Sequence, residues 1–194
     1  MLNWLLAALS GLLLVFIHPR FDFVWLAPVA VAPIAFALAR EPRLKRRFLL
    51  GYACGLVFWA GINYWIQFVM SVHGKLGPAG GWAAFVLFCF LRAVPLGLFA
   101  LAARPLLSTR FAVPLTAALW VAMERIPWLF NYTWLLLGNA GIDMAIPMRL
   151  APFTGVYGLS FVFAATGVAL ALIALRRPRA HTAWMLGVVL LFGL

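Results

Sequence analysis

Charged residues are scarce in this sequence, and acidic residues are the scarcest of all. Of the 194 residues, only 10% are charged and 4 are Asp or Glu, whereas 66% are hydrophobic. Soluble domains are about one quarter charged and about half apolar, so this composition excludes an ordinary soluble domain. The apolar residues fall in blocks bounded by charges or by Pro and Gly. This pattern predicts an all-α integral membrane protein, because helices satisfy their own backbone hydrogen bonds in lipid.

The residue types of common catalytic and metal sites are also few. The 3 histidines lie far apart without metal-ligand spacing, so we expect no metal site and no cofactor. Cys54 and Cys89 both lie inside apolar runs, where a free cysteine behaves as a small buried hydrophobic residue. Neither has an evident base beside it in the sequence. We therefore expect no catalytic residue in this chain.

The apolar blocks predict a polytopic bundle of about seven transmembrane helices, the last of them incomplete. The final block is shorter than the roughly 20 residues that cross a bilayer, so we expect the chain to be part of a longer protein. A segment rich in aromatic residues, Pro and Gly separates the fifth and sixth blocks and is expected to lie at the membrane interface. The expected spans are 2–17, 23–39, 48–73, 82–103, 111–125, 151–175 and 182–194, with the interfacial segment at 126–150.

Basic residues give the chain a formal net charge of +11 and gather in alternate connections. Lys and Arg are most frequent in residues 40–47, 104–110 and 176–181. The positive-inside rule places these connections and the N-terminus in the cytoplasm. No basic module with interleaved aromatic residues accompanies the charge, so we expect no nucleic-acid partner.

Polar side chains recur every four residues in the third predicted span. If residues 48–73 form one helix, Asn63, Gln67 and Ser71 lie on one stripe of it. Such a stripe can join neighbouring helices by hydrogen bonds, or it can face a groove that admits a lipid headgroup. A small transporter or channel could use the same stripe, together with Arg92, as a polar path, although the halves of the chain show no convincing repeat.

Two charged residues are expected at matching depths inside predicted spans, and Arg125 stands at the edge of one. At about 1.5 Å per residue from the cytoplasmic ends, Arg92 lies roughly 17 Å deep and Glu124 roughly 20 Å deep. A charge at such a depth usually faces the protein interior and has a partner. The matching depths predict a structural ion pair between Arg92 and Glu124.

The aromatic residues of the interfacial segment alternate along the chain. Trp128, Phe130, Tyr132 and Trp134 occupy every second position, which favours an extended or irregular backbone over a helix. Aromatic rings at this density are typical of the membrane–water interface. The segment could be a simple aromatic belt, or a structured loop at the mouth of a lipid-binding cavity.

The order of these features resembles the membrane region of apolipoprotein N-acyltransferases. The matching stretches are 61–74 with Trp65, 120–125 with Glu124, 132–138 with Trp134, and the Gly-Val-Tyr-Gly-Leu-Ser run at 155–160. The chain departs from the family where Asn131 and Thr133 replace a usual Gly and Pro. The resemblance implies a multi-pass protein of the bacterial inner (plasma) membrane. Its family transfers an acyl chain from phospholipid to the N-terminal diacylglyceryl-cysteine of lipoproteins.

The resemblance also implies which part of that reaction the chain serves. The family's Glu-Lys-Cys catalytic set belongs to a nitrilase-like domain that these residues lack, so the chain is expected to bind and orient lipid and to be inactive alone. The implied partners are membrane phospholipid, diacylglyceryl lipoprotein substrates and the nitrilase-like domain. A non-catalytic lipid-binding remnant of the family is the alternative. The candidate contacts to substrate lipid are Trp134, Tyr132, Trp65, Asn63 and Gln67.

Overall fold

The structure is a computed structural model that describes residues 1–126, 133–176 and 187, and every regular element in these ranges is helical. Short 3-10 helices (η) join the longer α-helices. In chain order the elements are α1 (Leu2–Phe16), η1 (Val24–Leu26), α2 (Ala27–Ala30), α3 (Ala32–Arg40), α4 (Leu44–Ile62), α5 (Ile66–Val72), α6 (Gly77–Leu106), α7 (Ala112–Arg125), η2 (Thr133–Leu135), η3 (Leu137–Asp143), η4 (Pro147–Leu150) and α9 (Ala151–Ala174).

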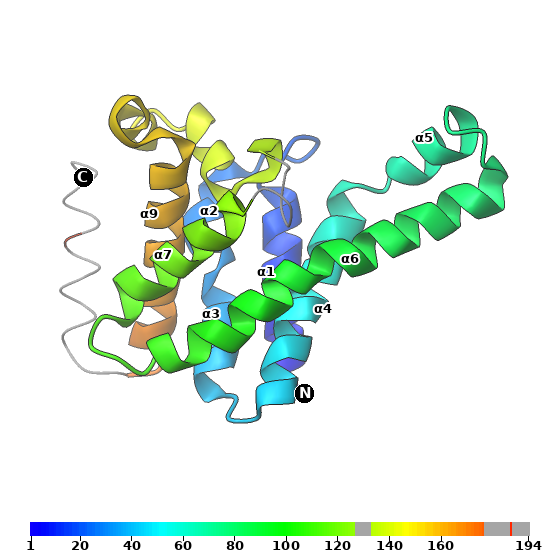
Figure 1. The fold of residues 1–194 in the computed structure, drawn as a ribbon. Helices are drawn as coiled ribbons and strands as arrows, with labels where there is room; N and C mark the ends of the chain where they lie inside the picture. The colour runs from blue at the N-terminus through cyan, green and yellow to red at the C-terminus, as the bar shows by residue number, and fades with distance from the viewer. Residues whose placement is uncertain (127–132, 177–186, 188–194) are drawn as a thin grey trace.

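The longer helices pack side by side in a bundle (Figure 1). α4 lies along α6 and also contacts α1, while α9 contacts α2, α3 and α7. Two glycines of α4 permit the close approach of α6. A Cβ atom at Gly51 would lie 2.2 Å from the carbonyl oxygen of Leu96, and one at Gly55 would lie 2.9 Å from Cα of Ala93. This is the packing that small residues four apart favour between membrane helices.

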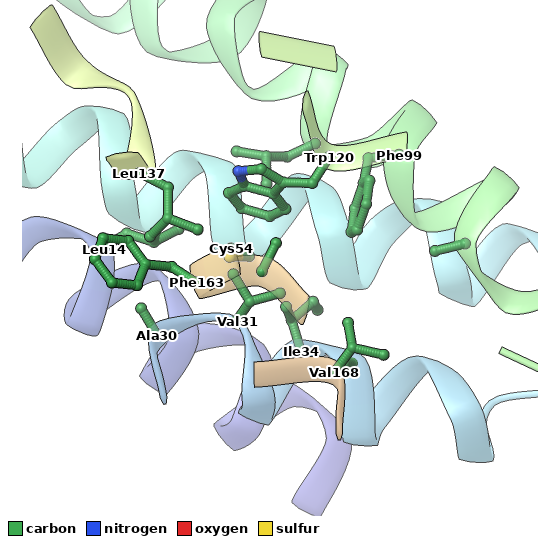
Figure 2. Packing of buried hydrophobic residues seen from close by; sticks show 14 of the residues in the cluster. Leu14, Ala30, Val31, Ile34, Cys54, Phe99, Trp120, Leu137, Phe163 and Val168 are labelled. Atoms are coloured by element: carbon green, nitrogen blue, oxygen red, sulfur yellow. The ribbon is translucent and has the colours of Figure 1, made fainter. Parts of the chain in front are cut away.

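Apolar side chains fill the space between the helices (Figure 2). The ring of Trp120 on α7 meets that of Phe99 on α6 edge to face, with centroids 5.1 Å apart. Leu137, from the segment that follows α7, is also buried in this core. The core therefore fixes part of the predicted interfacial segment against the bundle.

Two of the described helical stretches, Gly77–Leu106 and Pro147–Ala174, are long and apolar enough to cross a membrane. The bent pair α4 and α5 gives a third candidate span, and Leu2–Phe16 and Val24–Arg40 are shorter apolar helices. These lengths support a helical membrane protein, while the count of seven spans stays a prediction. The expected span 182–194 lies outside the described residues, apart from residue 187.

The third predicted span is not one helix. α4 ends at Ile62, α5 begins at Ile66, and the two axes differ by 58°. Asn63 leaves helical geometry with φ −111° and ψ 20°, and asparagine favours such departures because its side chain competes for backbone hydrogen bonds. Asn63 is therefore separated from Gln67 and Ser71, and the continuous polar stripe expected from the sequence is wrong.

The connections divide between the two ends of the bundle (Figure 1). The turn at 17–23 and the segment 133–150 lie at one end, and α5 with the first part of α6 projects sideways from the bundle near it. The basic connection 40–47 and the connection between α6 and α7 lie at the opposite end. Sequence segments far apart in the chain thus meet at the end that carries Trp134.

Candidate functional site

A hollow of about 240 Å³, here called the first hollow, opens where three connections meet. The turn after α1 contributes Arg20 and Phe21, the break between α4 and α5 contributes 63–65, and η2 contributes Trp134 and Leu135. Complete ligand pockets usually measure about 300–1,000 Å³. The first hollow is therefore of a size to hold part of a large ligand rather than the whole of it.

Aromatic rings and one cation line the first hollow. The rings of Trp65 and Trp134 meet edge to face with centroids 6.4 Å apart. The guanidinium carbon of Arg20 lies 4.9 Å from the ring centroid of Tyr64, within the range of a cation–π contact. An apolar wall beside an arginine suits a molecule that carries both hydrocarbon and an anionic group.

Asn63 adds an amide to this lining. Its side chain is 1% exposed, and its Nδ2 has no hydrogen-bond partner among the described residues. A buried amide donor without a partner costs free energy, so such groups usually mark a place that a ligand or water fills. Asn63 therefore offers a donor to a bound polar group.

A second hollow of about 440 Å³ shares Pro19 and Trp134 with the lining of the first. Its polar lining comprises His18 and Asp22 from the turn after α1, and Asn139 and Asp143 from η3. His18 is buried, and this burial lowers its pKa from 6.5 to about 4, so the imidazole is neutral at pH 7. Its Nε2 has no hydrogen-bond partner within the described ranges.

In the turn after α1, two charged residues that line the hollows have positive φ angles. Arg20 has φ 97° and Asp22 has φ 52°, which non-glycine residues adopt at a cost of about 1–3 kcal/mol each. The amides of Asp22 and Phe23 close the turn by donating to the carbonyl oxygens of His18 at 3.1 Å and Phe16 at 2.9 Å. The turn thus holds Arg20 at the first hollow and Asp22 at the second.

Two buried hydrogen bonds hold the segment with Trp134 against α7 and α9. Oε1 of Glu124 accepts from the backbone amide of Leu137 at 2.9 Å, and from Nε1 of Trp120 at 2.9 Å. Oγ of Ser160 accepts from the amide of Gly138 at 2.8 Å. The first of these contacts is at Leu137, three residues after Trp134, so they hold the backbone that carries that ring.

The structure brings three of the five lipid-contact candidates together. Asn63, Trp65 and Trp134 line the first hollow. Gln67 lies on α5, where its carbonyl oxygen would be 2.4 Å from a Cβ at Gly81, so its backbone packs on α6. Tyr132 lies outside the described residues. The roles of all five in binding stay predictions.

Glu124 and Arg92 have contacts other than the one predicted between them. The guanidinium of Arg92 lies 5.9 Å from the ring centroid of Trp59 and 5.6 Å from that of Phe88. Glu124 accepts its hydrogen bonds from Trp120 and Leu137, and its Oε2 has no hydrogen-bond partner in the described part of the chain. The ion pair stays a prediction, and the structure gives Glu124 a role in holding the chain after η2.

Sequence reasoning did not single out the charged residues of the two hollows. His18, Arg20 and Asp22 stand within the five-residue run His-Pro-Arg-Phe-Asp between two apolar blocks. Only 10% of the residues in the chain are charged, so three ionisable side chains within five residues are unusual. This density was the sequence signal that could have indicated a functional turn. Asp143 had no such signal, because only the folded chain places it beside the turn.

Comparison of the sequence with known proteins places the chain in a family. Residues 10–169 match the family described as "Apolipoprotein N-acyltransferase N-terminal domain". An apolipoprotein N-acyltransferase of Geobacter metallireducens is 35% identical over 179 residues, covering 87% of this chain and 33% of the relative. One of Chromobacterium violaceum is 30% identical over 203 residues, covering 97% of this chain and 37% of the relative. The chain spans about one third of the length of these relatives. By this match the chain belongs to the apolipoprotein N-acyltransferase family, whose N-terminal domain it contains.

Proposed function

We propose that this chain is the N-terminal transmembrane domain of an enzyme that transfers an acyl chain from phospholipid to lipoprotein, and that its part is to bind and orient the phospholipid. The match to apolipoprotein N-acyltransferases and the long apolar helices support this proposal. Catalysis would lie in a further, nitrilase-like domain. A domain that holds the two lipid substrates close together and correctly oriented accelerates the transfer by proximity, even if it contributes no catalytic residue.

One observation carries the proposal: Trp134 stands against Trp65 at the edge of a hollow that also holds Arg20 and Asn63. In this proposal the lipid phosphate binds the Arg20 guanidinium, because a guanidinium can donate two parallel N–H hydrogen bonds to phosphate oxygens. The free Nδ2 of Asn63 would donate to a further ester or phosphate oxygen. The two tryptophan rings would pack against the first carbons of the acyl chains, which extend from the hollow into the bilayer.

The same proposal sets the chain in the bacterial inner membrane with the N-terminus in the cytoplasm. In this orientation the basic connections face the cytoplasm, and Trp134 lies at the outer surface. The two hollows then open toward the side on which lipoproteins are modified. An accessibility assay of single cysteines introduced at positions 45 and 143 would place the two ends on opposite sides of the membrane.

Lipid retention tests the proposed role of the first hollow. The purified chain in a maltoside detergent is titrated with phosphatidylglycerol, and bound lipid is counted by native mass spectrometry. Because charge-assisted hydrogen bonds contribute about 1.5–3 kcal/mol, Arg20→Gln should weaken retention about tenfold or more. Trp134→Ala should also weaken it, through lost ring contacts.

Trp82 supplies the matched control for Trp134. It is 54% exposed, against 57% for Trp134, but it lies on α6 away from the first hollow. Trp82→Ala should therefore leave the dissociation constant unchanged. Equal losses in the Trp82 and Trp134 variants would mean that retention reflects general lipid contact, and would overturn the proposed site.

A further inference from the structure

The second hollow collects acidic side chains in a chain that has almost none. Only 4 Asp and Glu residues occur among 194, and two of them, Asp22 and Asp143, line this one hollow. They come from distant parts of the sequence, the turn after α1 and the end of η3. In a protein of net charge +11, the two carboxylates give this hollow a local charge opposite to that of the whole molecule.

A buried histidine without a partner points to a ligand at the same place. His18 lines the second hollow and is 1% exposed, and its Nε2 forms no hydrogen bond with the described residues. The neutral imidazole can accept a hydrogen bond at one ring nitrogen, and Asn139 adds a side-chain amide to the lining. Two carboxylates and an acceptor nitrogen suit a cation that donates several hydrogen bonds.

The geometry favours an organic cation over a metal ion. No group of three His, Cys, Asp or Glu side chains in the described ranges converges closely enough to hold a metal. The hollow measures about 440 Å³, far more than a single ion occupies. A primary ammonium group carries one positive charge and three N–H donors, so within this hollow it can pair with a carboxylate and donate to other polar groups of the lining without all of them meeting at one point.

We propose that the second hollow binds a primary ammonium group, through the carboxylates of Asp22 and Asp143 and the imidazole of His18. The inference rests on the proposed function, which offers two ligands with such a group. One is the headgroup of an aminophospholipid, and the other is the free α-amine of a diacylglyceryl-cysteine. Trp134 and Pro19 line both this hollow and the first one, which holds Arg20. A ligand that carries both a phosphate and an ammonium group could thus place the phosphate in the hollow with Arg20 and the ammonium in the hollow with Asp22 and Asp143.

Matched lipids and lipopeptides test the proposal with the purified chain in maltoside. Phosphatidylethanolamine and phosphatidylglycerol with identical acyl chains supply headgroups with and without the ammonium. An S-diacylglyceryl-cysteine peptide with a free or an acetylated α-amine supplies the second source. Native mass spectrometry gives a dissociation constant for each probe with the wild-type chain and with Asp22→Asn, Asp143→Asn and the double variant.

These substitutions remove charge and leave the fold intact. Both carboxylates are exposed, and asparagine tolerates the positive φ of 52° at position 22. Leu44→Lys at the start of α4, where Leu44 is 62% exposed, raises the net charge by the same single unit far from the hollow. It controls for the general effect of added positive charge.

We expect each Asn variant to weaken binding of an ammonium-bearing probe about fivefold, the loss typical of one partly exposed ion pair. Binding of phosphatidylglycerol and of the acetylated peptide should not weaken, and Leu44→Lys should not reproduce the loss. Loss confined to phosphatidylethanolamine identifies the headgroup as the ligand, and loss confined to the free-amine peptide identifies the acceptor amine.

Unchanged binding of both ammonium probes in the double variant overturns the inference, as does an equal loss for probes with and without the amine. The proposed function fails on a separate result, in which Arg20→Gln and Trp134→Ala retain phosphatidylglycerol as the wild-type chain does.

Discussion

Removing the carboxylate of Glu124 should release the segment that carries Trp134. Glu124→Ala leaves two buried donors, the Leu137 amide and the Trp120 indole, without the acceptor that each now reaches at 2.9 Å. Each unsatisfied buried donor costs about 1–3 kcal/mol, so the two together cost roughly 2–6 kcal/mol. Because Leu137 connects η2 to the core, most of this loss should appear as local opening of residues 133–143.

Hydrogen–deuterium exchange measures that opening directly. A loss of about 2 kcal/mol corresponds to roughly 30-fold faster exchange of the Leu137 amide, at about 1.4 kcal/mol per factor of ten. Amides in the middle of α4, which Glu124 does not contact, serve as the internal reference. Glu124→Gln keeps an acceptor oxygen for both donors and should stay within about tenfold of wild type. If the Leu137 amide exchanged at the wild-type rate in Glu124→Ala, the anchoring role would be refuted.

Three further substitutions test the packing that supports the site. Ser160→Ala removes the acceptor of the Gly138 amide and should speed exchange at Gly138 by about five- to 100-fold, while Ser160→Thr, which keeps the hydroxyl, should do less. Gly138→Ala places a Cβ 2.1 Å from the carbonyl oxygen of Val156, so lipid retention at the first hollow should fall; retention equal to wild type would show that η3 can shift without moving the site. Gly51→Ala places a Cβ 2.2 Å from the carbonyl oxygen of Leu96 and should lower the thermal unfolding midpoint in detergent, whereas an unchanged midpoint would mean that α4 and α6 separate at little cost.

The sequence predicted the helices best where apolar blocks have clear ends. The expected segments 2–17, 111–125 and 151–175 correspond to α1, α7 and α9 within a few residues. Charges, Pro or Gly bound each of these blocks, and such residues end helices for local reasons.

The break at 63–65 did not follow from hydropathy. Residues on both sides of it are apolar, so the block looks continuous, and Asn63 alone is a weak sign of a helix end. Beyond the bend α5 packs on α6 at Gly81, a contact between segments that a local pattern does not contain. Periodicity counted through such a bend gives the wrong shared face.

The site was predictable in its aromatic residues but not in its charges. Trp65 and Trp134 stood out through aromatic spacing and family resemblance, and the structure places their rings together. Arg20 and Asp143 acquire their positions from the meeting of two distant connections. Likewise, one of the two hydrogen-bond donors to Glu124 is a backbone amide, and a backbone donor cannot be recognised from the type of residue that carries it.

The most direct measurement is a structure of the chain determined in a lipid nanodisc that contains phospholipid. Our account predicts density for one lipid whose phosphate lies within about 3 Å of the Arg20 guanidinium, the distance of a charge-assisted hydrogen bond. Its first acyl carbons should pack against the rings of Trp65 and Trp134. A first hollow without lipid, with density only along the outer faces of the helices, would contradict the claim that this domain binds and orients the phospholipid.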